Sequence, residues 1–281
     1  MIKKYLFKNT FLKRNLIKLY EYYRYITICL PRNLLFKVSA YCRMYGIRVG
    51  EYQKLKKLHN AYLGKSCFII GTGPSLLNSD LEKIKGLLSF SVNSIVLSLD
   101  KTDWRPTFYG IQDSTAYNIL REKIIENQFS GVFCGISTPS LTPKMQEGYI
   151  AYPLYLYDHD IQTDKHFTEF SSNAYKKVCD GYTITYSLMQ IAYYMGFREI
   201  VLLGIDCDYV QGSRKNHIVE YTKTNNGNAV YLMRESYKVA REFADKHNLK
   251  IYNASRNPKL DVFEKIDLDQ YLKCKNYSQE I

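Results

Sequence analysis

Between residues 65 and 76 the chain reads Lys65-Ser-Cys-Phe-Ile-Ile-Gly-Thr-Gly-Pro-Ser-Leu76, a short apolar run followed by a glycine-containing turn. Residues 67–70 predict a buried strand, and a helical pattern begins at Leu76. Glycines between a strand and a helix let backbone N–H groups approach an anion closely, and the helix N-terminus adds a partial positive charge. The pattern therefore predicts a phosphate-binding turn, although an ordinary tight turn would have the same spacing. The predicted turn comprises Gly71, Thr72, Gly73, Pro74 and Ser75.

The composition is that of a globular protein of 281 residues, with 46% hydrophobic and 23% charged residues. This length accommodates one large α/β domain and an appendage. The seven cysteines form no Cys-x-x-Cys pair, which predicts reduced thiols in a cytoplasmic protein and neither a disulfide framework nor a zinc site. Because no apolar run reaches about 18 residues, we expect no membrane-spanning helix, and we expect no signal peptide.

The net charge of +12 comes from residues 1–60, which contain fourteen Lys or Arg but only two acidic residues, Glu21 and Glu51. Leucines, isoleucines and tyrosines recur among these charges at spacings of three and four. This pattern predicts a basic amphipathic helical extension. An anionic membrane surface is the favoured partner of such a helix. The alternative is a helix that packs on the catalytic domain, and we expect no nucleic-acid partner.

Beyond residue 60, strand-like and helix-like segments alternate. Such alternation predicts an α/β protein with a Rossmann-like, doubly wound and mostly parallel sheet over residues 61–281. Strands are expected at 67–70, 89–93, 106–113, 132–136, 199–206 and 250–254, and helices at 78–88, 115–127, 183–195 and 231–247. Residues 138–180 show no clear periodicity, which is typical of a lid over a site or of a disordered segment.

Polar residues stand at the ends of several predicted strands. Open α/β sheets bind ligands at the carboxyl ends of their strands, so Asn93, Asp113 and Asp206 are candidates for contact with a nucleotide. Gly204 precedes Asp206 at the end of a strongly apolar strand. Capping or turn formation is the structural alternative for Asn93 and Asp206.

Three further candidates follow from their positions in the chain. Gly181 permits a close approach of backbone to ligand, and Thr183 places a hydroxyl at the start of a predicted helix. His217 lies in the polar loop after Asp206, where a histidine can act as a general base near neutral pH. A solvated surface residue is the alternative for His217.

Several motifs occur together in a fixed order: Gly71-Thr-Gly-Pro-Ser-Leu76, Val92-Asn93, Gly181-Tyr-Thr-Ile-Thr185, Met195-Gly-Phe-Arg-Glu-Ile200, Gly204-Ile-Asp206 and Ile251-Tyr-Asn-Ala254. Over about residues 61–265 they resemble the Rossmann-like family named after the archaeal 6-hydroxymethylpterin diphosphokinase MptE. Bacterial members of this family often accompany surface-glycan genes. The glycine turn and the Gly-Ile-Asp strand end are also similar to those of bacterial sialyltransferases that use CMP-sugars.

The similarity to sialyltransferases implies a glycosyltransferase that uses a nucleotide-activated, CMP-linked sialic-acid-like sugar. Its acceptor would be a glycan or a lipid-linked molecule in the biosynthesis of surface polysaccharide or lipopolysaccharide. The protein would then be cytoplasmic and peripheral at the inner face of the cell membrane. The resemblance implies that His217 and Asp206 are catalytic, that Asn93 and the Gly181/Thr183 stretch contact the nucleotide, and that no cofactor is required.

The resemblance to the diphosphokinase implies a different reaction, the transfer of pyrophosphate from ATP to 6-hydroxymethyl-dihydropterin. In that reaction Asp113, Asp206 and Asp208 would hold Mg²⁺, which prefers hard oxygen ligands. A non-catalytic nucleotide-binding scaffold is the third alternative. The basic segment favours the glycosyltransferase, since a lipid-linked acceptor lies at a membrane and a pterin does not.

Overall fold

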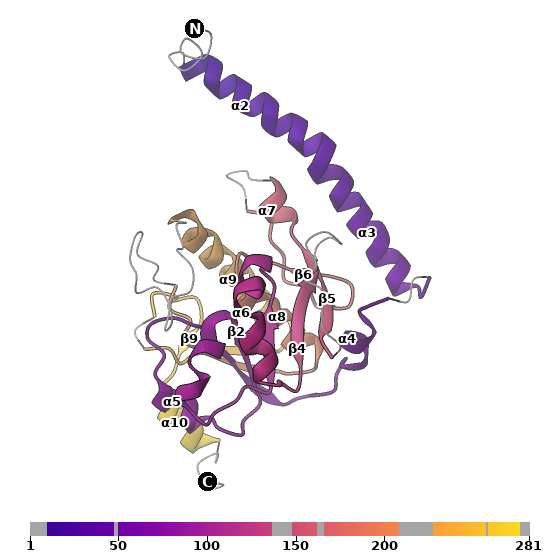
Figure 1. The fold of residues 1–281 in the computed structure, drawn as a ribbon. Helices are drawn as coiled ribbons and strands as arrows, with labels where there is room; N and C mark the ends of the chain where they lie inside the picture. The colour runs from indigo at the N-terminus through magenta and orange to yellow at the C-terminus, as the bar shows by residue number, and fades with distance from the viewer. Residues whose placement is uncertain are drawn as a thin grey trace.

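The computed structural model describes residues 10–47, 50–136, 148–161, 166–207, 227–256 and 258–275. At its centre is a nine-stranded sheet in the order β6-β5-β4-β3-β2-β1-β7-β8-β9, in which all neighbouring strands are parallel. Helices cover this sheet (Figure 1). The predicted Rossmann-like α/β fold is therefore confirmed.

The strands are β1 (Ser66–Ile70), β2 (Ser89–Val92), β3 (Phe108–Ile111), β4 (Val132–Ile136), β5 (Ile150–Tyr155), β6 (Val178–Cys179), β7 (Glu199–Leu203), β8 (Lys250–Asn253) and β9 (Glu264–Lys265). The α-helices are α2 (Thr10–Arg24), α3 (Leu30–Met44), α4 (Gln53–Lys57), α5 (Asn78–Lys83), α6 (Ser114–Glu126), α7 (Tyr157–Ile161), α8 (Ile184–Tyr194), α9 (Gly227–Lys246) and α10 (Leu268–Cys274). A π-helical turn, η1 (Tyr25–Cys29), joins α2 to α3, and two 3₁₀ turns, η2 (Asn93–Leu97) and η3 (Leu99–Lys101), follow β2.

The strand order reverses between β1 and β7. From β1 the chain adds strands in one direction as far as β6, and then returns through α8 to place β7 on the other side of β1. On the way α8 packs against β1, β2 and β3. This reversal is a topological switch point, where open α/β sheets commonly bind ligands at the carboxyl ends of the strands.

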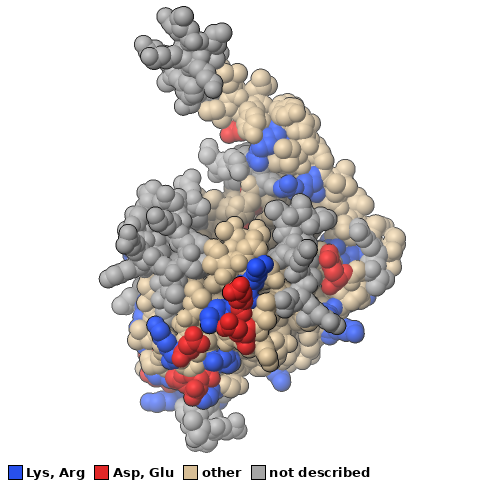
Figure 2. All heavy atoms as spheres, in the orientation of Figure 1, with Lys and Arg blue, Asp and Glu red and all other residues tan. Residues whose placement is uncertain are grey.

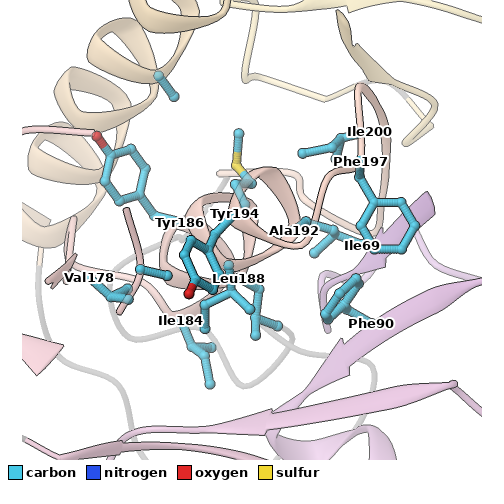
Figure 3. Close-up of a cluster of buried hydrophobic side chains, with 14 of the residues drawn as sticks. Ile69, Phe90, Val178, Ile184, Tyr186, Leu188, Ala192, Tyr194, Phe197 and Ile200 are labelled. Atoms are coloured by element: carbon cyan, nitrogen blue, oxygen red, sulfur yellow. The ribbon is translucent and has the colours of Figure 1, made fainter. Parts of the chain in front are cut away.

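Each face of the sheet carries its own hydrophobic cluster, because successive strand residues point to opposite faces. Cys67 and Ile69 of β1 belong to the cluster under α8 and α9, whereas Phe68 and Ile70 belong to the cluster under α5, α6 and α10. Figure 3 shows the first cluster, with side chains of α8 facing the strands that carry Ile69 and Phe90. Burial on both faces explains why the central strands read as continuous apolar runs.

The prediction of an irregular segment over residues 138–180 is wrong for two stretches within it. Residues 150–155 form β5 and residues 178–179 form β6, so these parts belong to the sheet and not to a lid. The strand β5 was missed for two reasons. A strand buried on both faces lacks the alternation of apolar and polar residues that marks a half-buried strand. In addition, Pro153 interrupts the apolar residues of β5, and proline is typical of turns. Proline has no backbone N–H to donate to a neighbouring strand, and β6 pairs only with Leu154 and Tyr155 of β5. Pro153 is therefore tolerated at its position in β5. Residues 137–147 and 162–165 lie outside the described ranges.

Two element boundaries also differ from the prediction. The helix expected at 78–88 begins at Asn78 as predicted, where the side chain of Asp80 accepts a hydrogen bond from the backbone N–H of Leu77, but it ends five residues early, at Lys83. The last part of the chain adds the short edge strand β9 before α10.

All seven cysteines lie in the described ranges, and none forms a disulfide. Within those ranges no helix has both the length and the apolar character needed to cross a membrane.

The C-terminal helix α10 is tied to the start of β7 through Glu199. Tyr271 Oη donates a hydrogen bond of 2.5 Å to Glu199 Oε1, and Lys275 Nζ donates one of 3.0 Å to Oε2. Burial raises the pKa of the Glu199 carboxyl, but the hydrogen bonds from Lys275 and Tyr271 outweigh it and lower the pKa below its usual value of 4.5. The ionised carboxylate therefore stabilises the docked helix.

This contact should be lost in acid. Because the folded pKa lies below the unfolded value, the stabilisation is fully present above about pH 4.5 and disappears as the pH falls through the folded pKa. Glu199→Gln should therefore destabilise the protein more at pH 7 than at pH 3, as measured by urea unfolding at both pH values. Glu264→Gln, at an exposed position of β9, is the control. An equal effect of Glu199→Gln at both pH values would contradict the assignment.

Candidate functional site

A cavity that opens to solvent lies at the carboxyl edge of the sheet at the switch point, with about 530 Å³ of empty space when the adjoining open solvent is included. Its walls come from the turns after β1, β2 and β7, from the first turn of α8, and from α9. Among the predicted site residues, those that line it are Gly71, Thr72, Gly73, Pro74, Asn93, Thr183, Gly204 and Asp206. The structure thus brings together residues that are more than 130 positions apart in the chain.

Three predicted residues lie in the structure but not in the cavity wall. Ser75 turns toward Asp206 and hydrogen-bonds to it. Asp113 caps α6, where its carboxylate accepts a 2.7 Å hydrogen bond from the Ala116 N–H. Gly181 has a φ of +55°, and a Cβ at this position would overlap the Tyr186 ring. The remaining two, Asp208 and His217, lie outside the described residues.

The two glycines of the first turn are needed for packing inside the protein. A Cβ on Gly71 would lie 2.5 Å from the Gly204 carbonyl oxygen, and a Cβ on Gly73 would lie 2.6 Å from the same atom. The Gly71 N–H donates to the Leu203 carbonyl and the Gly73 N–H to the Gly204 carbonyl, each at 2.8 Å. These N–H groups therefore hold the β1 and β7 turns together, and the binding of an anion by this turn stays a prediction.

Asp206 completes the connection between the two turns. Its Oδ2 accepts a hydrogen bond of 2.9 Å from the Ser75 N–H, and its Oδ1 accepts a short one from the Ser75 hydroxyl. The residue is buried, and it is the one charged residue among the described residues that line the cavity. A buried carboxylate satisfied in this way fixes the shape of the cavity wall.

Backbone strain gathers at this edge of the sheet. Asn93 after β2, Tyr182 before α8 and Cys207 after β7 have φ values of +45°, +63° and +48°. Left-handed conformations in residues other than glycine cost about 1–3 kcal/mol each and cluster at functional sites. The Tyr109 hydroxyl donates a 2.6 Å hydrogen bond to the Asn93 carbonyl and so stabilises that conformation. Burial raises the pKa of the Cys207 thiol to about 12, so this cavity residue is protonated at neutral pH.

The structure also reveals a carboxylate–histidine pair that the sequence did not indicate. The buried Asp180, directly after β6, lies with its Oδ2 2.7 Å from His159 Nδ1. Its Oδ1 accepts a 2.8 Å hydrogen bond from Gln112, and its Oδ2 also accepts one of 2.7 Å from the Tyr182 N–H. A carboxylate held in this way orients the imidazole and fixes its tautomer.

The sequence contains only a weak indication of the His159–Asp180 pair. His159 and Asp180 lie in the segment without periodicity, and β6, which positions Asp180, is only two residues long. A polar residue after an apolar pair was the one available sign of a strand end. The pair lies at the same carboxyl edge as the cavity, since Asp180 is three residues before Thr183 in the chain.

The fold and its topology define the protein as a Rossmann-like α/β protein with a cavity at its switch point. A family described as MptE-like, 6-hydroxymethylpterin diphosphokinase MptE-like, matches residues 47–212. The match covers more than half of the chain, and the protein belongs to this MptE-like family. The family description is that of a group-transferring enzyme and indicates a transferase as the general class.

Among solved structures, the one described as the MAf glycosyltransferase from Magnetospirillum magneticum AMB-1 is similar to this chain, with 17% sequence identity and a TM-score of 0.49. The similarity covers 81% of this chain but only 40% of the glycosyltransferase. The chain thus corresponds to less than half of that protein's length. No curated protein matches the sequence.

Proposed function

We propose that the protein is a glycosyltransferase that binds a nucleotide-activated sugar in the cavity at the β1/β7 switch point. The donor is a CMP-linked, sialic-acid-like sugar, and the acceptor is a surface glycan or its lipid-linked precursor. The observation that carries the proposal is the cavity itself, which unites the turn after β1, Asn93 and Thr183 at the edge where such folds bind nucleotides.

The side chains of the cavity suit a nucleoside monophosphate. With the glycine N–H groups used inside the protein, the hydroxyl groups of Thr183 and Thr185 and the amide of Asn93 are among the polar groups of the described wall. Met233 and Tyr237 of α9 supply an apolar side for a base. Thr183 is the N-cap residue of α8, yet its hydroxyl makes no capping hydrogen bond, which leaves it available to a phosphate oxygen.

The arrangement of carboxylates favours sugar transfer over the diphosphokinase reaction. Asp113 follows β3 and Asp206 follows β7, which are three strand spacings apart in the sheet. At about 4.8 Å per spacing their backbones are about 14 Å apart. Carboxylates that share one Mg²⁺ bind it at about 2.0–2.1 Å, and these two are directed elsewhere, to the cap of α6 and to Ser75.

In the proposed mechanism a histidine removes the proton of the acceptor hydroxyl as the sugar's anomeric carbon leaves the nucleotide phosphate. His217 is the proposed base, because it follows Asp206 closely in a polar stretch of the sequence. Asp206 acts as a positioning residue that holds the wall of the cavity through Ser75. His159, oriented by Asp180, is a second histidine at the same edge. No metal is required, since polar side chains can stabilise a leaving monophosphate.

Thr183→Val should weaken CMP binding about tenfold to a hundredfold, because a hydrogen bond to a charged group contributes about 1.5–3 kcal/mol. Isothermal titration of CMP and of ATP, with and without Mg²⁺, measures the effect. Thr115→Val, the same change at an exposed position of α6, is the control. Tight binding of ATP only with Mg²⁺, and none of CMP, would oppose the proposal in favour of the diphosphokinase.

A further inference from the structure

The N-terminal helix presents an apolar surface that no other described part of the protein covers. The elements α2, η1 and α3 form one continuous rod over residues 10–44 that extends from the side of the body (Figure 1). Many of its apolar side chains are exposed, and within α2 and within α3 a series of them is spaced three or four residues apart, which places them on one face of each helix. This apolar stripe comprises Leu19, Tyr23, Ile26, Leu30, Leu34 and Val38, whose side chains are between 43% and 64% exposed.

A different face of the rod anchors it to the body. Arg43 donates hydrogen bonds of 2.7 Å to the carbonyls of Tyr175 and Lys176, and the Tyr155 hydroxyl donates one of 2.7 Å to Asn33. The Phe36 ring packs on that of Tyr155 at 4.8 Å. These contacts fix the orientation of α3, so the stripe faces solvent because of the way the helix is anchored.

The charge of the rod indicates which kind of partner suits the apolar stripe. Residues 10–47 contain seven Lys or Arg and a single acidic residue, Glu21. Figure 2 shows the rod as a largely uncharged surface broken by patches of Lys and Arg. A second copy of this chain would bring like charges together, and like charges repel. Apolar and tyrosine side chains flanked by basic residues are instead typical of helices that lie in the interface of an anionic membrane.

We infer that the rod lies along the surface of an anionic lipid membrane with its apolar stripe buried among the headgroups. The inference does not depend on the reaction proposed above. Leucine and isoleucine enter the acyl boundary, tyrosines remain at headgroup level, and lysines extend their charged ends to the lipid phosphates.

This arrangement would also orient the cavity. The π-helical turn η1 packs against α7. Because α7 directly follows the carboxyl end of β5, α2 extends beyond the carboxyl edge of the sheet (Figure 1). The cavity lies at that edge, so a docked rod holds the entrance of the cavity near the lipid surface.

The test uses the full chain and two sets of vesicles, phosphatidylcholine alone and an equimolar mixture of phosphatidylcholine and phosphatidylglycerol. The unsubstituted protein should sediment with the mixed vesicles at least about tenfold more tightly, since each basic residue near an anionic surface contributes about fivefold. The triple variant Leu19→Ser, Tyr23→Ser, Leu34→Ser should lose at least about tenfold of this binding, because affinity follows buried apolar area.

A matched control separates the stripe from apolar exposure in general. The triple variant Leu63→Ser, Ile119→Ser, Tyr231→Ser removes side chains of similar exposure, 52% to 67%, that lie elsewhere on the body. This control should bind mixed vesicles like the unsubstituted protein, and both variants should keep the melting temperature. Equal losses in the two triple variants would overturn the inference, as would absence of vesicle binding at low salt. A lipid-free dimer that only the stripe variant dissociates would assign the stripe to a second copy instead.

Discussion

Gly71→Ala should destabilise the protein by about 3 kcal/mol, a large part of the stability of an ordinary domain. The added Cβ would lie 2.5 Å from the Gly204 carbonyl oxygen and 2.9 Å from Ile205 Cγ1. Neither turn can move away, because β1 and β7 pair along their full lengths, from Ser66 with Glu199 to Ile70 with Leu203. Urea unfolding followed by circular dichroism measures the change.

Gly50→Ala is the matched control for this experiment. A Cβ at Gly50 meets no atom within 4 Å, so the same substitution should leave the unfolding midpoint nearly unchanged. A Gly71→Ala protein as stable as the control would show that the two turns are less closely packed than their contacts indicate. The overlap at Gly73 is similar, so loss of ligand binding in a Gly73 variant would report the disturbed wall and not a lost phosphate contact.

The glycine turn illustrates what a sequence can and cannot decide. The apolar run before Gly71 correctly predicted β1, because a central parallel strand is buried on both faces and needs apolar residues throughout. The glycines correctly indicated that something approaches the backbone closely. Sequence could not tell whether that neighbour is a ligand or protein, and in the structure it is the Gly204 carbonyl.

Long-range contacts explain most of the remaining differences. The pairing of Asp180 with His159 depends on β6, which forms only because β5 offers it an edge. Amphipathicity predicted the N-terminal helix, but it did not show which face is anchored. The anchored face is determined by individual contacts, such as the hydrogen bond from Arg43 to the Tyr175 carbonyl, which joins two residues 132 positions apart in the chain. In addition, α4 is part of the body, since Leu55 is buried in its core.

His217→Ala should lower the rate of sugar transfer by about 10²–10⁴-fold and leave donor affinity nearly unchanged, because a general base acts in the transition state. Steady-state kinetics together with CMP titration separates the two quantities. His247→Ala is the control, since His247 follows the C-terminal end of α9, whereas the cavity lies at the carboxyl edge of the sheet. A comparable loss in His159→Ala with none in His217→Ala would assign the base to the His159–Asp180 pair.

The same assays separate sugar transfer from the diphosphokinase reaction through their metal dependence. Sugar transfer should continue in EDTA, whereas formation of AMP from ATP and a hydroxymethylpterin requires Mg²⁺ to neutralise the transferred phosphates. Asp206→Asn does not separate them, because the NH₂ group of an asparagine side chain can only donate, so one of the two hydrogen bonds that Ser75 donates to Asp206 is lost or reversed in either reaction. The Asp206→Asn protein should therefore bind nucleotide less tightly, whichever reaction the protein catalyses. EDTA-sensitive AMP formation by the intact protein is therefore the result that would contradict sugar transfer.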